Sequence, residues 1–211
     1  MTMAELSMLN ERFGIHDQLV FSEGPGGLAV VEIANSLAVA TVALQGAHLL
    51  SWIPRGEQPV IWLSGDARFE AGQSIRGGVP VCWPWFGPHA TQPSFPAHGF
   101  ARTVLWQVCE TKTLEDGATS VVFGVMRTDA TDVFWPHRSE LELGIKVGAT
   151  LELDLMTRNT GAESITIGDA LHTYFAVSDV RHIAVEGLEG CPYIDKLDSD
   201  KRKQQSGVAE S

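Results

Sequence analysis

The segment from residue 74 to residue 102 constrains the fold most strongly, because it cannot form a regular helix or a central strand. It contains the run SIRGGVPVCWPWFGPH and, shortly after, AHGFAR. Gly77 and Gly78 permit backbone angles that other residues resist, while the three prolines fix φ and remove backbone donors. The segment is therefore expected to be a rigid, aromatic-lined loop.

Three polar side chains stand out within this loop. Arg76 and His98 each directly precede a glycine, and Arg102 lies three residues after Gly99. Binding residues concentrate on rigid irregular loops. Guanidinium groups suit anionic oxygens, and flat rings suit the apolar faces of a sugar. The alternatives are that the arginines pair with internal carboxylates and that Trp83, Trp85 and Phe86 are simply core residues.

The rest of the chain predicts an all-β protein. In residues 141–147 and 150–157 leucine, isoleucine and valine alternate with polar residues or glycine, which is typical of half-buried antiparallel strands. Further strands are expected at residues 28–34, 37–44, 47–53, 60–63 and 164–177. Apart from a short helix at residues 4–13, no long amphipathic helix is indicated, so an antiparallel β-sandwich is predicted.

Changes in composition divide the chain into three parts. Residues 1–27 end in the breaker EGPGG and are expected to be peripheral. Residues 28–194 are expected to form the sandwich domain. Residues 195–211 are rich in charge and poor in apolar side chains, and are expected to be a polar loop or tail.

The net charge and the cysteine content indicate which binding partners and which cellular compartment to expect. The net charge of −11 argues against nucleic acid or an anionic membrane, which both require a basic face. Cys82, Cys109 and Cys191 are odd in number and far apart, so we expect reduced thiols and a cytoplasmic protein. The first twenty residues contain no continuous apolar run, so neither a signal peptide nor a membrane span is expected.

Three motifs resemble a known family when they are taken together. RGGVPVCWPWFG, AHGFAR and ALHTYF occur in this order from Arg76 to Phe175. In this they resemble the hexose-6-phosphate mutarotases (glucose-6-phosphate 1-epimerases), which are relatives of aldose 1-epimerase. The resemblance runs from about residue 28 to the end of the chain. It implies the galactose-mutarotase β-sandwich (a supersandwich), and that this chain lacks the C-terminal strands of that fold.

The resemblance also implies roles for four residues. His172 matches the catalytic histidine, His98 matches a sugar ligand, and Arg76 and Arg102 match arginines associated with sugar-phosphate binding. Mutarotation opens the C1–O5 bond of a pyranose and needs one group that takes a proton and another that gives one. Histidine suits this work because it titrates near neutrality, and neither a cofactor nor a metal is implied. The residues alone favour the alternative that His172 is a core histidine bonded to a carbonyl.

The resemblance assigns no residue of this sequence as the general base. The resemblance implies a glutamate in a later segment, which this sequence does not contain; Asp169, Glu186 and Asp195 are acidic residues near His172 in sequence. The expected function is therefore interconversion of the α and β anomers of a hexose 6-phosphate or another aldose. The alternatives are a non-catalytic sugar-phosphate-binding module and, on weaker grounds, a structural domain whose tryptophans are only core.

Overall fold

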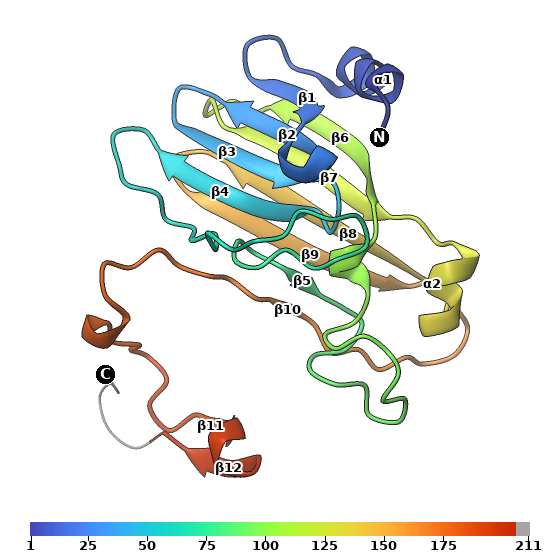
Figure 1. Ribbon diagram of the computed structural model, residues 1–211, viewed down its shortest axis with the longest axis vertical. Helices are drawn as coiled ribbons and strands as arrows, with labels where there is room; N and C mark the ends of the chain where they lie inside the picture. The colour runs from blue at the N-terminus through green and yellow to red at the C-terminus, as the bar shows by residue number, and fades with distance from the viewer. Residues whose placement is uncertain (206–211) are drawn as a thin grey trace. The chain divides into compact units, whose positions relative to one another are not determined.

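The computed structural model describes residues 1–205 (Figure 1). The chain divides into two compact units, with the boundary between Ala176 and Val177. The expected boundaries after residues 27 and 194 differ from this division. In the part of the chain that the structure describes, no helix is long and apolar enough to cross a membrane.

The first sheet of the larger unit is built from consecutive antiparallel strands. Their order across the sheet is their order along the chain: β1 (Leu19–Glu23), β2 (Ala29–Ala34), β3 (Ala38–Ala43) and β4 (His48–Pro54). The turn between β2 and β3 is closed by the Asn35 side chain, whose oxygen accepts the N–H groups of Leu37 and Ala38, at 2.9 Å each. Side-chain oxygens of this kind commonly replace a backbone acceptor in tight turns.

The second sheet repeats this arrangement. Its antiparallel strands are β6 (Trp106–Thr113), β7 (Thr119–Val125), β8 (Ser139–Val147) and β9 (Leu151–Asn159). The short helix α2 (Asp129–Phe134) connects β7 to β8. In β8 every second residue from Leu141 to Val147 is buried, which confirms the period-two prediction.

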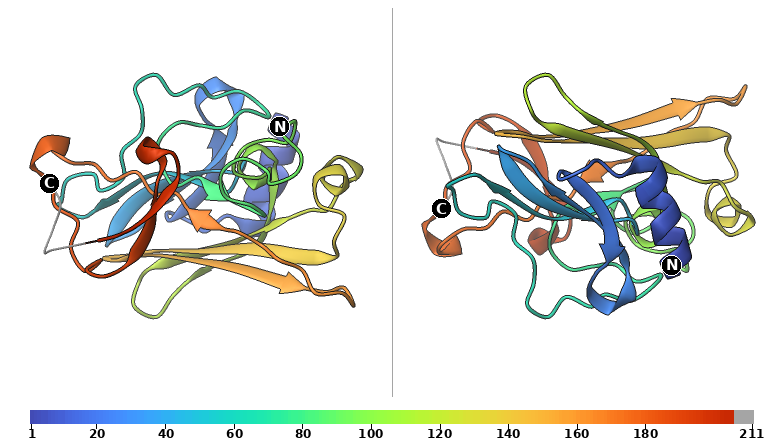
Figure 2. Two further views of the ribbon diagram at one scale, coloured as in Figure 1. Left: turned by 90° about the horizontal axis from the view of Figure 1, so that it is seen from below. Right: turned by 90° about the horizontal axis from the view of Figure 1, so that it is seen from above.

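The two sheets lie face to face and enclose the core (Figure 2). Phe123 and Leu143 of the second sheet and Val42 of the first are fully buried between them. Asn35 joins the layers, because its amide donates to Thr119 Oγ1 at 3.0 Å and to the Val147 carbonyl at 2.9 Å. The prediction of an antiparallel β-sandwich is therefore confirmed.

The N-terminal segment is more integrated than the sequence suggests. Helix α1 (Met3–Phe13) begins with a capping box between Thr2 and Glu5, which satisfies amide groups that a helix start leaves unpaired. Its Asn10 side chain exchanges two hydrogen bonds of 2.7 Å with the backbone of Phe21 in β1. Residues 1–27 thus supply both an edge strand and part of the core, because Leu6 and Phe21 are buried.

Two expected strands are reduced to short pairings. The segment 164–177 contains only β10 (Ala170–Leu171), paired with β5 (Val81–Cys82), and the segment 60–63 contributes only single bridges. The partner segment limits the pairing: Pro80 accepts a bond from the His172 N–H but has no N–H to return. The short 3-10 helices η1 (Pro25–Gly27) and η2 (Ala101–Thr103) complete this unit.

The smaller unit is a hairpin preceded by loops. Its elements are η3 (Val180–His182), β11 (Pro192–Asp195), η4 (Lys196–Asp198) and β12 (Lys201–Gln204), and β11 and β12 are antiparallel. Asp195 accepts hydrogen bonds from the N–H groups of Leu197 and Asp198 and pairs with Lys203 at 2.7 Å. The expected polar tail therefore contains a strand from residue 201 to 204, and its last six residues lie outside the described part.

Candidate functional site

The loop that carries His98 is held closed by its own backbone. Gly99 has φ of +71°, and a Cβ at this position would collide with the carbonyl group of Trp83. The Phe100 N–H donates to that same carbonyl at 3.1 Å. A side chain cannot be accommodated where two backbone segments approach so closely, so Gly99 is required for this loop.

His98 itself is fixed by Gly87. Its φ of +67° lies in the left-handed region, which non-glycine residues rarely occupy. Its N–H donates to the Gly87 carbonyl at 2.7 Å, and its Nδ1 accepts the Gly87 N–H at 3.3 Å. When the imidazole is neutral, this acceptor role at Nδ1 places its proton on Nε2.

His172 is brought beside His98 by the pairing of β10 with β5. The centroids of the two imidazole rings lie 6.1 Å apart, with their planes nearly perpendicular. The His172 ring also stacks on Tyr174, at 5.0 Å, and on Phe86, at 6.2 Å. The His172 and Tyr174 rings therefore lie side by side.

The rings form a continuous aromatic row, which we define as Trp62, Tyr174, His172, Phe86 and His98. Trp62 extends it through a ring contact of 5.9 Å with Tyr174, and Phe86 contacts His98 at 4.8 Å. Trp62 and Phe86 are exposed, and the other three are half-buried. Such a row offers flat apolar surface beside two groups that can exchange protons.

The tryptophans of the loop have a different role. Trp83 is buried and donates from Nε1 to Thr157 Oγ1 at 3.0 Å, and Trp85 donates from Nε1 to the Pro96 carbonyl at 3.0 Å. Buried tryptophan N–H groups normally find such acceptors. Trp83 is therefore a core residue, and Phe86 and His98 are the rings that the loop contributes to the row.

Arg76 is an exposed arginine directly before a double-glycine turn. Gly77 and Gly78 have φ of +96° and +69°, and the Gly78 carbonyl accepts the Tyr174 N–H at 2.9 Å. Within residues 1–205, the Arg76 guanidinium forms no hydrogen bond or ion pair. The backbone bond from Tyr174 to Gly78 thus connects the turn after Arg76 to the segment that carries His172. The exposed Arg76 guanidinium is accessible to an anionic ligand.

Arg102 is more constrained than Arg76. One of its terminal nitrogens, Nη2, donates to the Ala97 carbonyl at 2.8 Å. Its Nε is buried, and no described residue accepts a hydrogen bond from it. Arg102 therefore spans the turn that contains His98, and at least one of its donors supports this loop.

Sequence reasoning missed His48, at the start of β4. It is 1% exposed, and its Nε2 lies 2.8 Å from the Gly77 carbonyl oxygen. Burial of the ring lowers the pKa of His48 to about 4, with the Gly77 hydrogen bond opposing this and the Arg102 charge contributing to it. His48 is consequently neutral near pH 7. The surrounding sequence, in which His48 is a single histidine in an apolar run, does not indicate its burial or its contact with Gly77.

In the larger unit, residues 1–176, no carboxylate forms an ion pair with His172, and Asp169 is exposed. In the smaller unit Glu186 is exposed, and the pKa of Asp195 is lowered chiefly by its hydrogen bond from Lys203. In residues 1–205 no group of three or more histidine, cysteine or acidic side chains could hold a metal ion, and the three cysteines are free.

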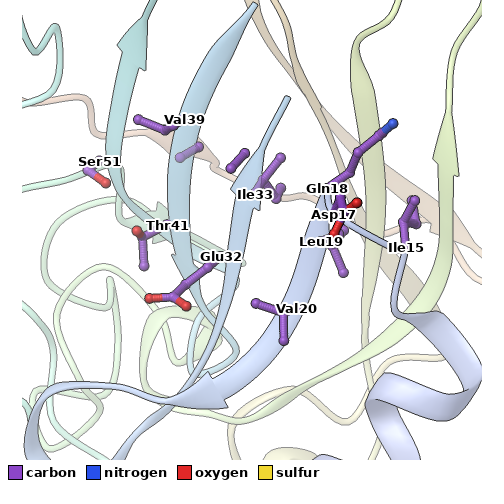
Figure 3. Close-up of a pocket in the computed structure, with 12 residues that line it drawn as sticks. Ile15, Asp17, Gln18, Leu19, Val20, Glu32, Ile33, Val39, Thr41 and Ser51 are labelled. Atoms are coloured by element: carbon purple, nitrogen blue, oxygen red, sulfur yellow. The ribbon is translucent and has the colours of Figure 1, made fainter. Parts of the chain in front are cut away.

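A groove on the outer face of the first sheet is separate from this site. Its open part is lined by Val20, Glu32, Thr41 and Ser51, which point away from the core (Figure 3). It contains none of the residues of the aromatic row and no arginine. An acidic side chain and hydroxyl groups without a cation are poorly suited to an anionic sugar.

Solved structures share the architecture described above. A crystal structure of a candidate mutarotase, YeaD, from Salmonella typhimurium superposes with a TM-score of 0.86 at 35% identity, covering 97% of this chain and 68% of that one. A galactose mutarotase related enzyme from Lactobacillus acidophilus has a TM-score of 0.58 at 17% identity, covering 76% and 52% respectively. The fold is therefore the galactose-mutarotase-like β-sandwich.

Sequence comparisons define the family more closely. The family model described as aldose 1-epimerase matches residues 29–208. A candidate glucose-6-phosphate 1-epimerase of Escherichia coli is 44% identical over 174 residues, which are 82% of this chain and 57% of that protein. A protein of Cenchrus ciliaris with the same description is 32% identical over 194 residues, 88% of this chain and 58% of its own length.

The chain belongs to the aldose 1-epimerase family. It spans a little over half the length of the curated relatives that it matches.

Proposed function

We propose that this chain forms the substrate-binding site of an enzyme that interconverts the α and β anomers of a hexose 6-phosphate. The observation that carries the proposal is the pair of imidazoles 6.1 Å apart within the aromatic row. Two of the relatives described above are candidate glucose-6-phosphate 1-epimerases, which supports the sugar phosphate as the substrate.

The chemistry assigns different work to the two imidazoles. Ring opening requires a proton at the ring oxygen and removal of the proton from the C1 hydroxyl. We assign His172 as the donor of the proton to the ring oxygen, and His98, with its proton on Nε2, as a hydrogen-bond donor that orients the sugar. A solvent water takes the proton of the C1 hydroxyl. Tyr174 and Phe86 stack on the His172 ring and would hold its plane against the sugar.

Arg76 is assigned to the phosphate group. Its guanidinium is exposed and forms no ion pair within the described residues, and planar guanidinium donors match phosphate oxygens. The net charge of −11 repels an anionic substrate, so a local cation is required to hold it. Arg102 is assigned a supporting part, since its Nη2 is bonded to Ala97.

The catalytic assignment is tested by two-dimensional exchange NMR on the anomers of glucose 6-phosphate with the 211-residue chain. His172→Ala is expected to reduce the accelerated exchange at least about a hundredfold, the usual effect of losing an acid–base group. His16→Ala, a replacement of a fully solvent-facing histidine, is the matched control and should leave the rate unchanged. Equal rates for His172→Ala and wild type would remove His172 from the mechanism.

The phosphate assignment is tested by comparing two sugars. Arg76→Ala should weaken the binding of glucose 6-phosphate roughly tenfold or more, because hydrogen bonds to charged groups contribute about 1.5–3 kcal/mol. The affinity for glucose should be unchanged. Arg68→Ala, an exposed arginine in the preceding loop, serves as the control. Equal weakening of both sugars by Arg76→Ala would exclude a phosphate role.

A further inference from the structure

His48 is a buried titratable side chain to which the mechanism above gives no part. It pairs with Ala43 across β3 and β4, on the face of the first sheet that residues 63–75 cover. Its Nε2 must carry the proton, because the atom 2.8 Å away is a carbonyl oxygen. The ring is neutral near pH 7, since burial lowers its pKa to about 4. His48 is therefore a fixed hydrogen-bond donor to Gly77.

This bond reaches the turn directly after Arg76. The two glycines of the turn pack against His48 so closely that a Cβ on Gly78 would lie 2.5 Å from Nε2. The Gly78 N–H donates to the Trp62 carbonyl at 2.8 Å, and the Gly78 carbonyl accepts the Tyr174 N–H at 2.9 Å. The turn is thus held between His48 below it and two residues of the aromatic row.

The other ring nitrogen of His48, Nδ1, is not used by the bond to Gly77. His48 Nδ1 and Arg102 Nε are both buried, and neither has a hydrogen-bond partner among the described residues. The Arg102 charge contributes to the low pKa of His48, so the two groups interact. Arg102 in turn bonds the Ala97 carbonyl, next to His98. His48 is therefore bonded to the turn that follows Arg76, and its charged form is disfavoured by the Arg102 charge.

We propose that His48 is a positioning residue, which sets Arg76 relative to the imidazole pair and so makes the site selective for phosphorylated sugars. This inference rests on the proposed function for its consequence in binding. Its structural half, that His48 holds the turn at residues 76–78, stands on the hydrogen bond and the close packing alone.

The structural half is tested by amide hydrogen exchange on the 211-residue chain. His48→Leu removes the hydrogen-bond donor and fills its place with an apolar side chain. It should lower the protection of the Gly78 and Tyr174 amides from exchange at least about tenfold, because one hydrogen bond contributes about that factor to the closed state. His48→Gln retains a donor and should restore protection. The Leu143 amide in β8 should be unaffected. Full protection of Gly78 in His48→Leu would overturn the proposal.

The functional half is tested by affinities for two sugars, measured by tryptophan fluorescence. His48→Leu should weaken the binding of glucose 6-phosphate about tenfold and change the affinity for glucose by no more than about twofold. His48→Gln should recover most of the lost affinity. In an Arg76→Ala background His48→Leu should have no further effect, because both changes remove the same interaction. Equal losses for both sugars, or an undiminished effect in that background, would show a merely structural role.

Two further results separate the claims. If His48→Leu does not fold, His48→Asn, whose shorter amide does not reach Gly77, takes its place in both experiments. If wild type binds neither sugar while exchange at Gly78 rises as expected, the proposed function fails and the positioning of the Arg76 turn by His48 is upheld.

Discussion

The buried, neutral state of His48 predicts a pH dependence of stability. Burial lowers the pKa of this ring from 6.5 to about 4 in the folded chain. Below pH 6.5 the unfolded chain binds a proton that the folded chain excludes, so the free energy of unfolding falls as the pH is lowered. The contribution is present in full above pH 6.5 and is lost progressively down to pH 4.

The magnitude follows from the same values. A pKa of about 4 instead of 6.5 corresponds to about 3 kcal/mol, since each unit is worth about 1.4 kcal/mol. Between pH 6.5 and pH 5 the expected loss is about 2 kcal/mol. This is a large part of the stability of an ordinary domain, which is about 5–15 kcal/mol.

Urea unfolding followed by tryptophan fluorescence measures this loss, because all six tryptophans lie in residues 1–176. Wild type and His16→Gln should lose about 2 kcal/mol more than His48→Gln between pH 6.5 and pH 5. The glutamine variant lacks a titrating group at this position, whereas His16 is exposed. Parallel curves for wild type and His48→Gln would refute the reasoning.

Three further predictions concern the framework of the site. Gly99→Ala should destabilise the chain by at least about 2 kcal/mol and abolish sugar binding, since its left-handed φ and the Trp83 carbonyl leave no room for a Cβ; a variant that binds normally in an NMR titration would contradict this. Phe123→Ala, at a fully buried position, should cost about 3–5 kcal/mol in urea unfolding, and a cost below about 1 kcal/mol would place Phe123 outside the core. Asn35→Ala should cost about 2–3 kcal/mol, because it removes two bonds across the sheets, and an unchanged urea midpoint would show that these bonds do not stabilise the sandwich.

Regular alternation was a reliable guide to the paired strands. Residues 141–147 lie within β8, and all of the predicted segment 150–157 except Thr150 lies within β9, because one face of each strand is turned to the core. The expected strand at residues 164–177 is mostly absent. This segment forms only a two-residue strand, since its partner contains glycines with positive φ and a proline without an N–H.

The candidate site was predictable only in part. The motifs identify His98 and His172, but their contact arises from the pairing of β10 with β5, which no spacing in the sequence encodes. The bond from Arg102 to Ala97 and the burial of His48 likewise depend on packing between distant segments. Residue types thus indicated the chemistry, and the tertiary structure determined which side chains meet.

The most direct test of the account is the two-dimensional exchange spectrum of glucose 6-phosphate with the wild-type chain. The account predicts exchange cross-peaks between the α and β anomers at mixing times where the sugar alone gives none. Sugar resonances that shift on titration with no faster exchange would contradict it, and would identify these residues as a sugar-phosphate-binding module without catalytic activity.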